Sequence, residues 1–272
     1  MAFAFNVFNA ETTLGVIEAA LKHNQPIYLQ TSASTVRFYS ARRLYGLIDA
    51  LIPVEKRKYF ILHLDHCDDM TMIDQCIEAG WDSVMIDASA YPLHENIERT
   101  LRVVNRAREQ DVLVEGEIGT LAGEGEDGFG EGRPDIHELT AIECQLFIES
   151  TGVDLAAIAV GNRHGYYPEG ACQIDVDLLA EVHQLCPDSA LVLHGGSGIP
   201  HDQVAEAVRV GGVRKINIST DVKDAYLNGM QKHLSGDGQE RHDMTACVGT
   251  TVSAVKELAG ERLSLLKRIS QS

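Results

Sequence analysis

Residue types that bind metal ions and phosphate stand in four short strings of this sequence, each directly after an apolar run. The strings are His63–His66, Gly161–Gly165, Leu193–Gly198 and Asn217–Asp221. They contain histidines, carboxylates and two loops rich in glycine or hydroxyl side chains. Imidazoles are common zinc ligands, and backbone N–H groups in small-residue turns bind phosphate. The inventory therefore predicts a zinc site beside a phosphate site.

Three of the histidines are candidate metal ligands, namely His66, His164 and His194. A catalytic zinc ion usually keeps three protein ligands and one open position. Any one of these residues alone would be an ordinary polar side chain, but three at the ends of three strands can converge on one point. His63 lies two positions before Asp65 and so points to the same side of the strand. We interpret His63 as a partner in an inner layer.

Asp65 is the candidate proton carrier, because a carboxylate beside a metal ion is well placed for proton transfer. Along a strand its side chain should point away from that of His66, so we expect Asp65 next to the metal rather than on it. The alternative roles of Asp65 are a helix N-cap or an orienting partner of a ligand. Asp68 and Asp69 are the better N-cap candidates for the helix that follows.

The candidate phosphate site lies in the last two strings. Gly195, Gly196 and Ser197 form a turn of small residues, and Pro200 then begins a helix whose N-terminus favours negative charge. The neighbouring strand adds polar side chains at its end. They are Asn217, Ser219 and Thr220.

Short β-rich runs alternate with helical patterns along the whole chain, and eight strand-to-helix steps favour a (β/α)8 TIM barrel, with one last helix at 244–269. We expect a single domain over residues 1–272. In such barrels the chemistry lies at the carboxyl ends of the strands, where the four strings fall. The predicted strands are Ala2–Val7, Pro26–Gln30, Phe60–Leu64, Ser83–Ile86, Val112–Ile118, Asp154–Val160, Ala190–Leu193 and Lys215–Ile218.

Composition narrows the class of protein. The formal net charge of −17 argues against a nucleic-acid partner, because phosphate backbones attract Lys and Arg patches. The sequence shows no signal-peptide pattern and no apolar run long enough for a membrane span. Six cysteines without Cys-x-x-Cys spacing are typical of reduced thiols. We therefore expect a cytoplasmic protein that does not bind nucleic acid or membranes.

The strings together resemble the class II, zinc-dependent ketose-bisphosphate aldolases, which include the fructose- and tagatose-bisphosphate enzymes. The resemblance runs from Ala4 to the C-terminal helix, and its further specific segments are Ser83–Asp87 and Glu115–Gly119. It implies cleavage of a phosphorylated ketose to dihydroxyacetone phosphate and an aldehyde. It also implies a homodimer or homotetramer, and a monovalent cation near the phosphate site in addition to zinc.

The resemblance implies a role for each matching residue. His66, His164 and His194 would bind zinc, with Glu117 supporting the site or serving as an alternative ligand. Asp65 would move the proton of the substrate hydroxyl, and Glu126 matches the acid of the family's lid loop. Ser32 is expected near the aldehyde. The residues implied to bind dihydroxyacetone phosphate are Gly165, Gly195, Gly196, Ser197, Asn217, Ser219 and Thr220.

Three departures from the family pattern bear on these expectations. The family usually has a helix before the first strand, whereas here the first predicted strand starts at Ala2, so that helix is apparently missing. The lid segment 119–127 is one residue longer than the family's, which leaves Glu124 as a second match to the lid acid. Some members have a Lys shortly after the His-Gly pair, where this chain has Tyr166 and Tyr167. The aldehyde half of the substrate therefore stays open.

Two other functions fit parts of the pattern. Zinc-dependent barrel hydrolases also use histidines at strand ends, but they often carry His-x-His on the first strand, which here ends in Asn6. A non-catalytic, phosphosugar-binding companion subunit would keep the fold, yet the retained histidines and Asp65 argue for an enzyme. Release of dihydroxyacetone phosphate would separate the three hypotheses.

Overall fold

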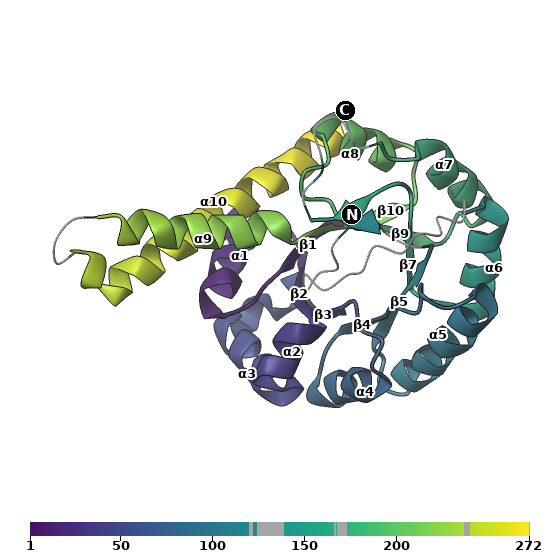
Figure 1. Cartoon of the computed structure of the whole chain (residues 1–272), viewed down its shortest axis with the longest axis horizontal. Helices are drawn as coiled ribbons and strands as arrows, with labels where there is room; N and C mark the ends of the chain where they lie inside the picture. The colour runs from purple at the N-terminus through teal and green to yellow at the C-terminus, as the bar shows by residue number, and fades with distance from the viewer. Residues whose placement is uncertain (120–121, 124–138, 166, 168–172, 237–239, 272) are drawn as a thin grey trace.

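The computed structural model describes residues 1–119, 122–123, 139–165, 167, 173–236 and 240–271, and within them eight parallel strands close into a barrel. Figure 1 shows the barrel end-on, with helices around it. The order around the barrel is β1-β10-β9-β7-β5-β4-β3-β2. These strands are β1 (Ala2–Asn6), β2 (Ile27–Ser32), β3 (Phe60–Asp65), β4 (Ser83–Ile86), β5 (Leu113–Ile118), β7 (Leu155–Ile158), β9 (Ala190–Leu193) and β10 (Val213–Ile218).

Helices follow the strands and cover the outside of the barrel. Local capping explains several of their starts: Asn9 forms a capping box with Thr12, Asp69 accepts from the backbone of Thr71 and Met72, and Thr140 is the N-cap of a third helix. The helices are α1 (Ala10–His23), α2 (Ala33–Tyr39), α3 (Ala41–Leu51), α4 (Met70–Ala79), α5 (Leu93–Arg108), α6 (Ala141–Thr151), α7 (Val176–Leu185), α8 (His201–Arg209), α9 (Thr220–Leu234) and α10 (Met244–Gln271).

The barrel separates two interiors of different chemistry. Side chains alternate between the faces of a strand, so Phe3 and Phe5 pack outward in the large apolar core under the helices. The lumen holds a small apolar cluster that includes Ala4 and Tyr28. Many other inward-facing side chains are polar and almost fully buried. They are Asn6, Gln30, His63, Asp65, Ser83, Glu115, Glu117, His194, Lys215 and Asn217.

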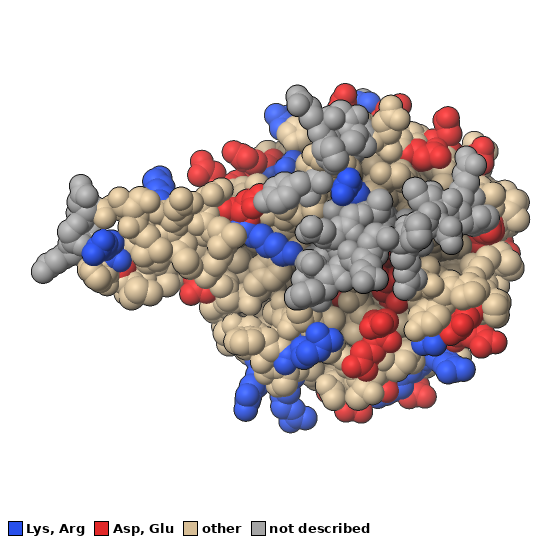
Figure 2. Space-filling view, viewed as in Figure 1, with Lys and Arg blue, Asp and Glu red and all other residues tan. Residues whose placement is uncertain are grey.

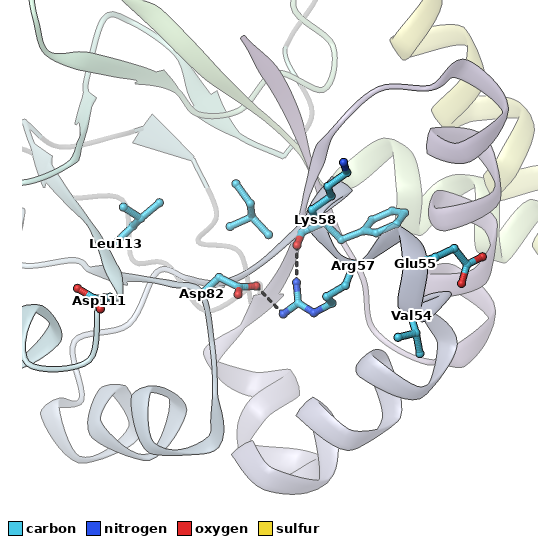
Figure 3. Close-up of a pocket in the computed structure, with 9 residues that line it drawn as sticks. Val54, Glu55, Arg57, Lys58, Asp82, Asp111 and Leu113 are labelled. Atoms are coloured by element: carbon cyan, nitrogen blue, oxygen red, sulfur yellow. Dashed lines mark hydrogen bonds and ion pairs between the residues drawn. The ribbon is translucent and has the colours of Figure 1, made fainter.

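The base of the barrel, at the amino ends of the strands, carries an open depression of about 790 Å³. Figure 3 shows Arg57 beside it, from the 3₁₀ helix η1 (Val54–Tyr59). The guanidinium donates to the carbonyl of Phe60 at 2.6 Å and pairs with Asp82 at 2.8 Å. Asp82 also accepts from the backbone N–H of Leu62. Arg57 thus fastens the starts of β3 and β4, far from the carboxyl ends where chemistry is expected.

Helices α9 and α10 form an arm that projects beyond the barrel wall (Figure 1). The inner half of α10 packs on α1, where Val255 and Ala259 are fully buried. The outer part of the arm exposes large apolar side chains: Leu227 and Leu234 on α9 are 58% and 52% exposed, and Met244 at the start of α10 is 68% exposed. Figure 2 shows that the visible face of this arm is mostly uncharged. None of the described helices combines the length and apolar composition that a membrane span requires.

The prediction of a (β/α)8 barrel with an extra C-terminal helix is confirmed. The predicted boundaries of the eight barrel strands agree with the structure within two residues. Two elements between β2 and β3, α3 and η1, were not predicted from the sequence. A small two-stranded sheet of β6 (Ala122–Gly123) and β8 (Arg163–His164) beside the barrel mouth was not predicted either. The rest of the predicted lid lies outside the described residues.

Candidate active site

Asp65 ends β3 at the mouth of the barrel and is fully buried. Two amides hold its carboxylate: Asn6 donates to Oδ2 at 2.9 Å and Asn217 donates to Oδ1 at 3.2 Å. Gln30 in turn donates to the side-chain oxygen of Asn6 at 2.8 Å. Three neighbouring strands therefore fix the position of one carboxylate. Ser32 lies beside Asp65 in the strand register, and its hydroxyl bonds with those of Ser34 and Thr35 at the start of α2.

His66 lies immediately after Asp65, and its backbone explains how both side chains reach one site. Its φ of +37° is in the left-handed region, which is costly for a residue other than glycine and is often found at functional sites. The strand alternation expected between the two side chains is therefore interrupted. The ring Nδ1 of His66 lies 3.0 Å from Oδ2 of Asp87 and 3.5 Å from Oε2 of Glu117.

His194 faces His66 across the mouth, with ring centroids 4.6 Å apart. It follows β9 and is 1% exposed. Its Nε2 lies 2.8 Å from Oε1 of Glu115, and its Nδ1 lies 3.4 Å from Oε2 of Glu117. Glu115 also accepts from the ammonium of Lys215 at 2.8 Å, deeper in the lumen. The imidazole thus connects the mouth of the barrel with a buried ion pair below it.

These groups fit a divalent cation. One potential ligand atom each from Asp65, His66 and His194 lies within 4.8 Å of the others, and the same holds for His66, Asp87 and Glu117. Imidazole and carboxylate are ligands that zinc accepts. The buried charges also favour a bound cation. Within the described part of the chain, Lys215 is the only buried Lys or Arg, whereas Asp65, Glu115 and Glu117 are three buried carboxylates. A cation would offset the excess negative charge.

The carboxylates in this cluster differ in pKa. Burial raises the pKa of Asp65, but the neighbouring His66, Lys215 and His194 lower it more, so that it lies below its ordinary value. Burial, followed by the charge of Asp87, raises the pKa of Glu117 above its ordinary value. Opposite shifts of neighbouring acids are a feature of catalytic sites. At neutral pH this arrangement favours an ionised Asp65.

The third predicted ligand, His164, lies in β8, which pairs in parallel with β6 at the edge of the mouth. Its side chain lies outside the described part of the structure. Asn162, two residues before His164, is 2% exposed, and its side-chain amide donates to the carbonyl of His194 at 2.9 Å. The backbone that carries His164 is therefore fastened to the backbone that carries His194.

The glycine loop after β9 lies against the end of β10. Gly195 has a φ of +62°, and a Cβ there would collide with the carbonyl of Arg163, so a side chain is excluded on both counts. The N–H of Gly196 donates to the carbonyl of Asn217 at 2.9 Å. The hydroxyl of Ser197 accepts from the N–H of Asp221 at 3.2 Å. The loop thus packs against the amino-terminal end of α9.

Other predicted residues fall on the same rim. Ser219 and Thr220 lie at the start of α9, and Gly165 follows β8 with a φ of +82°. The amide of Asn217 donates to Asp65, and its backbone carbonyl accepts from Gly196 of the glycine loop. Glu126 and the alternative Glu124 lie outside the described residues.

Tyr167 is a residue that the sequence analysis left without a role at this rim. Its hydroxyl accepts from the N–H of Arg163 at 3.0 Å and donates to the carbonyl of Gly195 at 3.1 Å. It thereby joins the segment that carries His164 to the glycine loop. Asn6 and Lys215 were also missed, and their inward register on β1 and β10 is the signal that could have found them.

The profile of the family described as class-II fructose-bisphosphate aldolase matches residues 1–271. The chain belongs to this family. It is 32% identical to a fructose-bisphosphate aldolase of Streptococcus pyogenes, covering 96% of this chain and 90% of the relative. It is 34% identical to one of Staphylococcus aureus, covering 93% and 87%. The enzyme is accordingly an aldolase, a carbon–carbon lyase, from a family that depends on a metal ion.

Solved structures agree with this assignment. The YdjI aldolase from Escherichia coli K12 is 26% identical, with a TM-score of 0.79 over 97% of this chain and 90% of that one. A putative fructose-1,6-bisphosphate aldolase from Coccidioides immitis superposes with a TM-score of 0.85 over 99% and 92%. At 24% identity the latter likeness concerns the fold alone.

Proposed function

We propose that the enzyme is a zinc-dependent aldolase that reversibly cleaves a phosphorylated ketose, similar to fructose or tagatose 1,6-bisphosphate, to dihydroxyacetone phosphate and an aldehyde. The observation that carries this proposal is the convergence of Asp65, His66 and His194, with ligand atoms within 4.8 Å, beside the glycine loop after β9. A site for a cation and a site for a phosphate on one rim is what a sugar phosphate requires.

In this proposal His66, His164 and His194 bind the zinc ion, and Glu117 supports the site or replaces a ligand. Bound zinc supplies a Lewis acid that withdraws electrons from the substrate carbonyl. The position of Glu117 supports this role, because its Oε2 lies within 3.5 Å of ring nitrogens of both His66 and His194. The donor set suits zinc better than magnesium, which prefers oxygen ligands and keeps several waters.

Asp65 is proposed to accept the proton of the hydroxyl on the carbon that becomes the aldehyde. The bond between this carbon and the ketose half then breaks, and its electron pair stays with the dihydroxyacetone phosphate half until that half is protonated. Asp65 suits the step because the neighbouring cations keep it ionised and the amides of Asn6 and Asn217 fix its position. The same carboxyl would return its proton to the aldehyde oxygen during condensation. Glu126 remains the proposed second acid.

The phosphate is proposed to bind at the rim formed by the loops after β9 and β10, where this fold often binds phosphate. The proposed residues are glycines or have short side chains, and backbone N–H groups can therefore come close to an anion. A monovalent cation at this rim is part of the proposal. The residues are Gly165, Gly195, Gly196, Ser197, Asn217, Ser219 and Thr220, with Ser32 nearer the aldehyde.

A cleavage screen tests the proposal. Purified enzyme is incubated with a panel of phosphorylated ketoses, including fructose and tagatose 1,6-bisphosphate, and released dihydroxyacetone phosphate is measured. We expect release from at least one ketose, loss of release after chelation, and recovery with added zinc. Zinc binding without release from any ketose would instead favour a non-catalytic companion subunit, and activity unaffected by chelation would contradict the metal dependence.

Metal analysis of His194→Ala tests the ligand set directly. The change removes one imidazole from the cluster, so we expect less bound zinc per chain than in the wild type. The exposed His242 on the projecting arm provides a matched control, because His242→Ala removes an imidazole far from the cluster. Unchanged zinc stoichiometry in His194→Ala would remove this residue from the proposed ligands.

We also propose that the enzyme is a homodimer or homotetramer in which the projecting arm contacts a second copy. Residues 244–255 of α10 contain no charged side chain, although 23% of the chain is charged, and Met244 and Val248 are exposed there. Depletion of charge with exposed apolar side chains is typical of protein interfaces. Light scattering of Leu227→Glu with Val248→Glu is expected to show a smaller particle than the wild type, and an unchanged mass would contradict the proposal.

A further inference from the structure

A chain of buried polar groups runs beneath the proposed metal site through the lumen of the barrel. Ser83, His63, Lys215, Glu115 and His194 follow one another at hydrogen-bond distance, and all five are at most 1% exposed. The contacts are 2.8 Å from Ser83 to Nδ1 of His63, 3.2 Å from Nε2 of His63 to Lys215, 2.8 Å from Lys215 to Glu115 and 2.8 Å from Glu115 to His194.

The chemistry of Lys215 fixes the direction of each hydrogen bond. An ammonium has three donors and no acceptor, so Nε2 of His63 must accept from Lys215, and Nδ1 of His63 must carry the proton that is donated to Ser83. This agrees with the low pKa of His63, about 3, which arises from burial and from the charge of Lys215. His63 is therefore neutral and of one tautomer.

The other side of Lys215 leads to His194. Oε2 of Glu115 accepts from Lys215, and a carboxylate has no proton to donate. The ammonium of Lys215 lies 2.8 Å from the fully buried Glu115 and favours its carboxylate form. Oε1 of Glu115 must therefore accept from Nε2 of His194. A neutral His194 then carries its proton on Nε2 and leaves Nδ1 with a lone pair, on the side of Glu117 and the metal cluster.

We propose that Glu115, held by Lys215, is a positioning residue that sets the tautomer of His194 and turns Nδ1 toward the metal ion. The inference rests on the proposed function, since it concerns the same metal site. Orienting hydrogen bonds of this kind are worth about 10- to 100-fold in metal affinity. The residue touches neither substrate nor metal and acts through His194 alone.

The decisive variant is Glu115→Gln, because Lys215 controls how the new amide turns. Lys215 can only donate, so the amide oxygen must face Lys215, and the amide NH₂ then faces Nε2 of His194. Nε2 must now accept, and the proton moves to Nδ1, where it blocks the metal ion. We expect the zinc affinity of the apoprotein, measured by competition with a chromophoric chelator, to fall about 10- to 100-fold.

The double variant Lys215→Met with Glu115→Gln is expected to restore most of this affinity. Without the ammonium the amide can turn over, and its oxygen can again accept from Nε2 of His194. Histidine nitrogen NMR of the apoproteins at pH 8 should show the Nδ1–H tautomer of His194 in Glu115→Gln and the Nε2–H tautomer in the double variant. A merely structural role predicts no recovery, since the double variant carries more changes than the single one.

Arg57→Met is the matched control for a broken ion pair. It removes the half-buried pair with Asp82 at the base of the barrel (Figure 3). We expect a lower melting temperature and wild-type zinc affinity. Equal zinc affinity in Glu115→Gln and the wild type would overturn the inference and leave the proposed function intact, whereas a wild type that does not bind zinc would overturn both.

A final comparison covers the case in which Glu115→Gln does not fold. Lys215→Met with Glu115→Leu also lacks both charges, but leucine cannot accept a hydrogen bond. We expect this pair to bind zinc about 10- to 100-fold more weakly than Lys215→Met with Glu115→Gln. Equal affinities in the two double variants would overturn the inference.

Discussion

The two halves of the site are built from different parts of the chain. At the metal end, Asp65, His66 and His194 are side chains at strand ends, and Asn6 and Lys215 support them from inside the barrel. At the phosphate end, the proposed contacts come from the backbone of turns, which glycine loops make accessible. The first half depends on which side chains are present, and the second depends on which side chains are absent.

This difference separates the effects that substitutions should have. A change at the metal end removes a group that takes part in the reaction, so it should lower kcat or metal content. A change at the phosphate end shifts a backbone that binds the unreactive part of the substrate, so it should mainly raise KM for phosphorylated ketoses. The division between the two halves would be weakened if a change at the metal end mainly raised KM, or if a change at the phosphate end mainly lowered kcat.

The largest effect is expected for Asp65→Ala. Loss of a positioned proton carrier typically costs 10²- to 10⁴-fold in rate, and we expect kcat to fall by about that factor. Zinc content should stay near that of the wild type, because the histidines remain. Steady-state kinetics and metal analysis of the same preparation check both points. Near-wild-type kcat in a correctly folded Asp65→Ala enzyme would contradict the proposed role.

Gly195→Ala should have the next largest effect. The new Cβ would meet the carbonyl of Arg163, at a φ that alanine adopts poorly. The loop must then move, and with it the proposed phosphate contacts. We expect KM to rise about tenfold or more, as for the loss of a hydrogen bond to a charged group, with a smaller change in kcat. In Gly46→Ala on α3 the new Cβ would meet nothing, so unchanged kinetics are expected there.

Ser197→Ala should have a smaller effect of the same kind. The hydroxyl accepts from the N–H of Asp221, and its loss leaves that N–H to find another partner. A single uncharged hydrogen bond contributes about 0.5–1.5 kcal/mol, which corresponds to a rise in KM of roughly two- to twelvefold. A fall in kcat with constant KM would place Ser197 in the chemical step and would break the division between the two halves.

The sequence predicted the barrel and its strand ends well because both depend on local patterns. Apolar runs of strand length recur between helical patterns, and the polar strings follow the runs. It also predicted that His63 lies in an inner layer, because the two-residue period of a strand is reliable within one strand. The same rule misplaced His66, whose left-handed backbone is set by the turn after β3 and not by the strand pattern.

The missed residues have long-range causes. Asn6 and Lys215 are ordinary polar residues in β1 and β10 until the barrel closes and brings them to Asp65 and Glu115. Tyr167 gains its role only because Gly195 lies beside it in space. Contacts of this kind depend on strand register around a closed barrel, which no single segment encodes. The extra helix α3 was missed because it follows α2 after only Ser40.

The smallest predicted effect concerns the seal of the lumen below the metal end. Tyr28 is almost buried, and burial together with the charge of Glu115 raises its pKa to about 12. The unfolded chain releases this proton near pH 10, whereas the folded chain keeps it until about pH 12. Ionisation therefore stabilises the unfolded state first, and the free energy of unfolding should fall as the pH rises between these values.

Denaturant titrations of Tyr28→Phe should show a shallower fall of the free energy of unfolding than the wild type in this window. Tyr59→Phe, at the base of the barrel, is the matched control and should follow the wild type. An equally steep fall in Tyr28→Phe would mean that the lumen admits water and hydroxide at Tyr28, and the polar network that supports the metal end would then not be sealed from solvent.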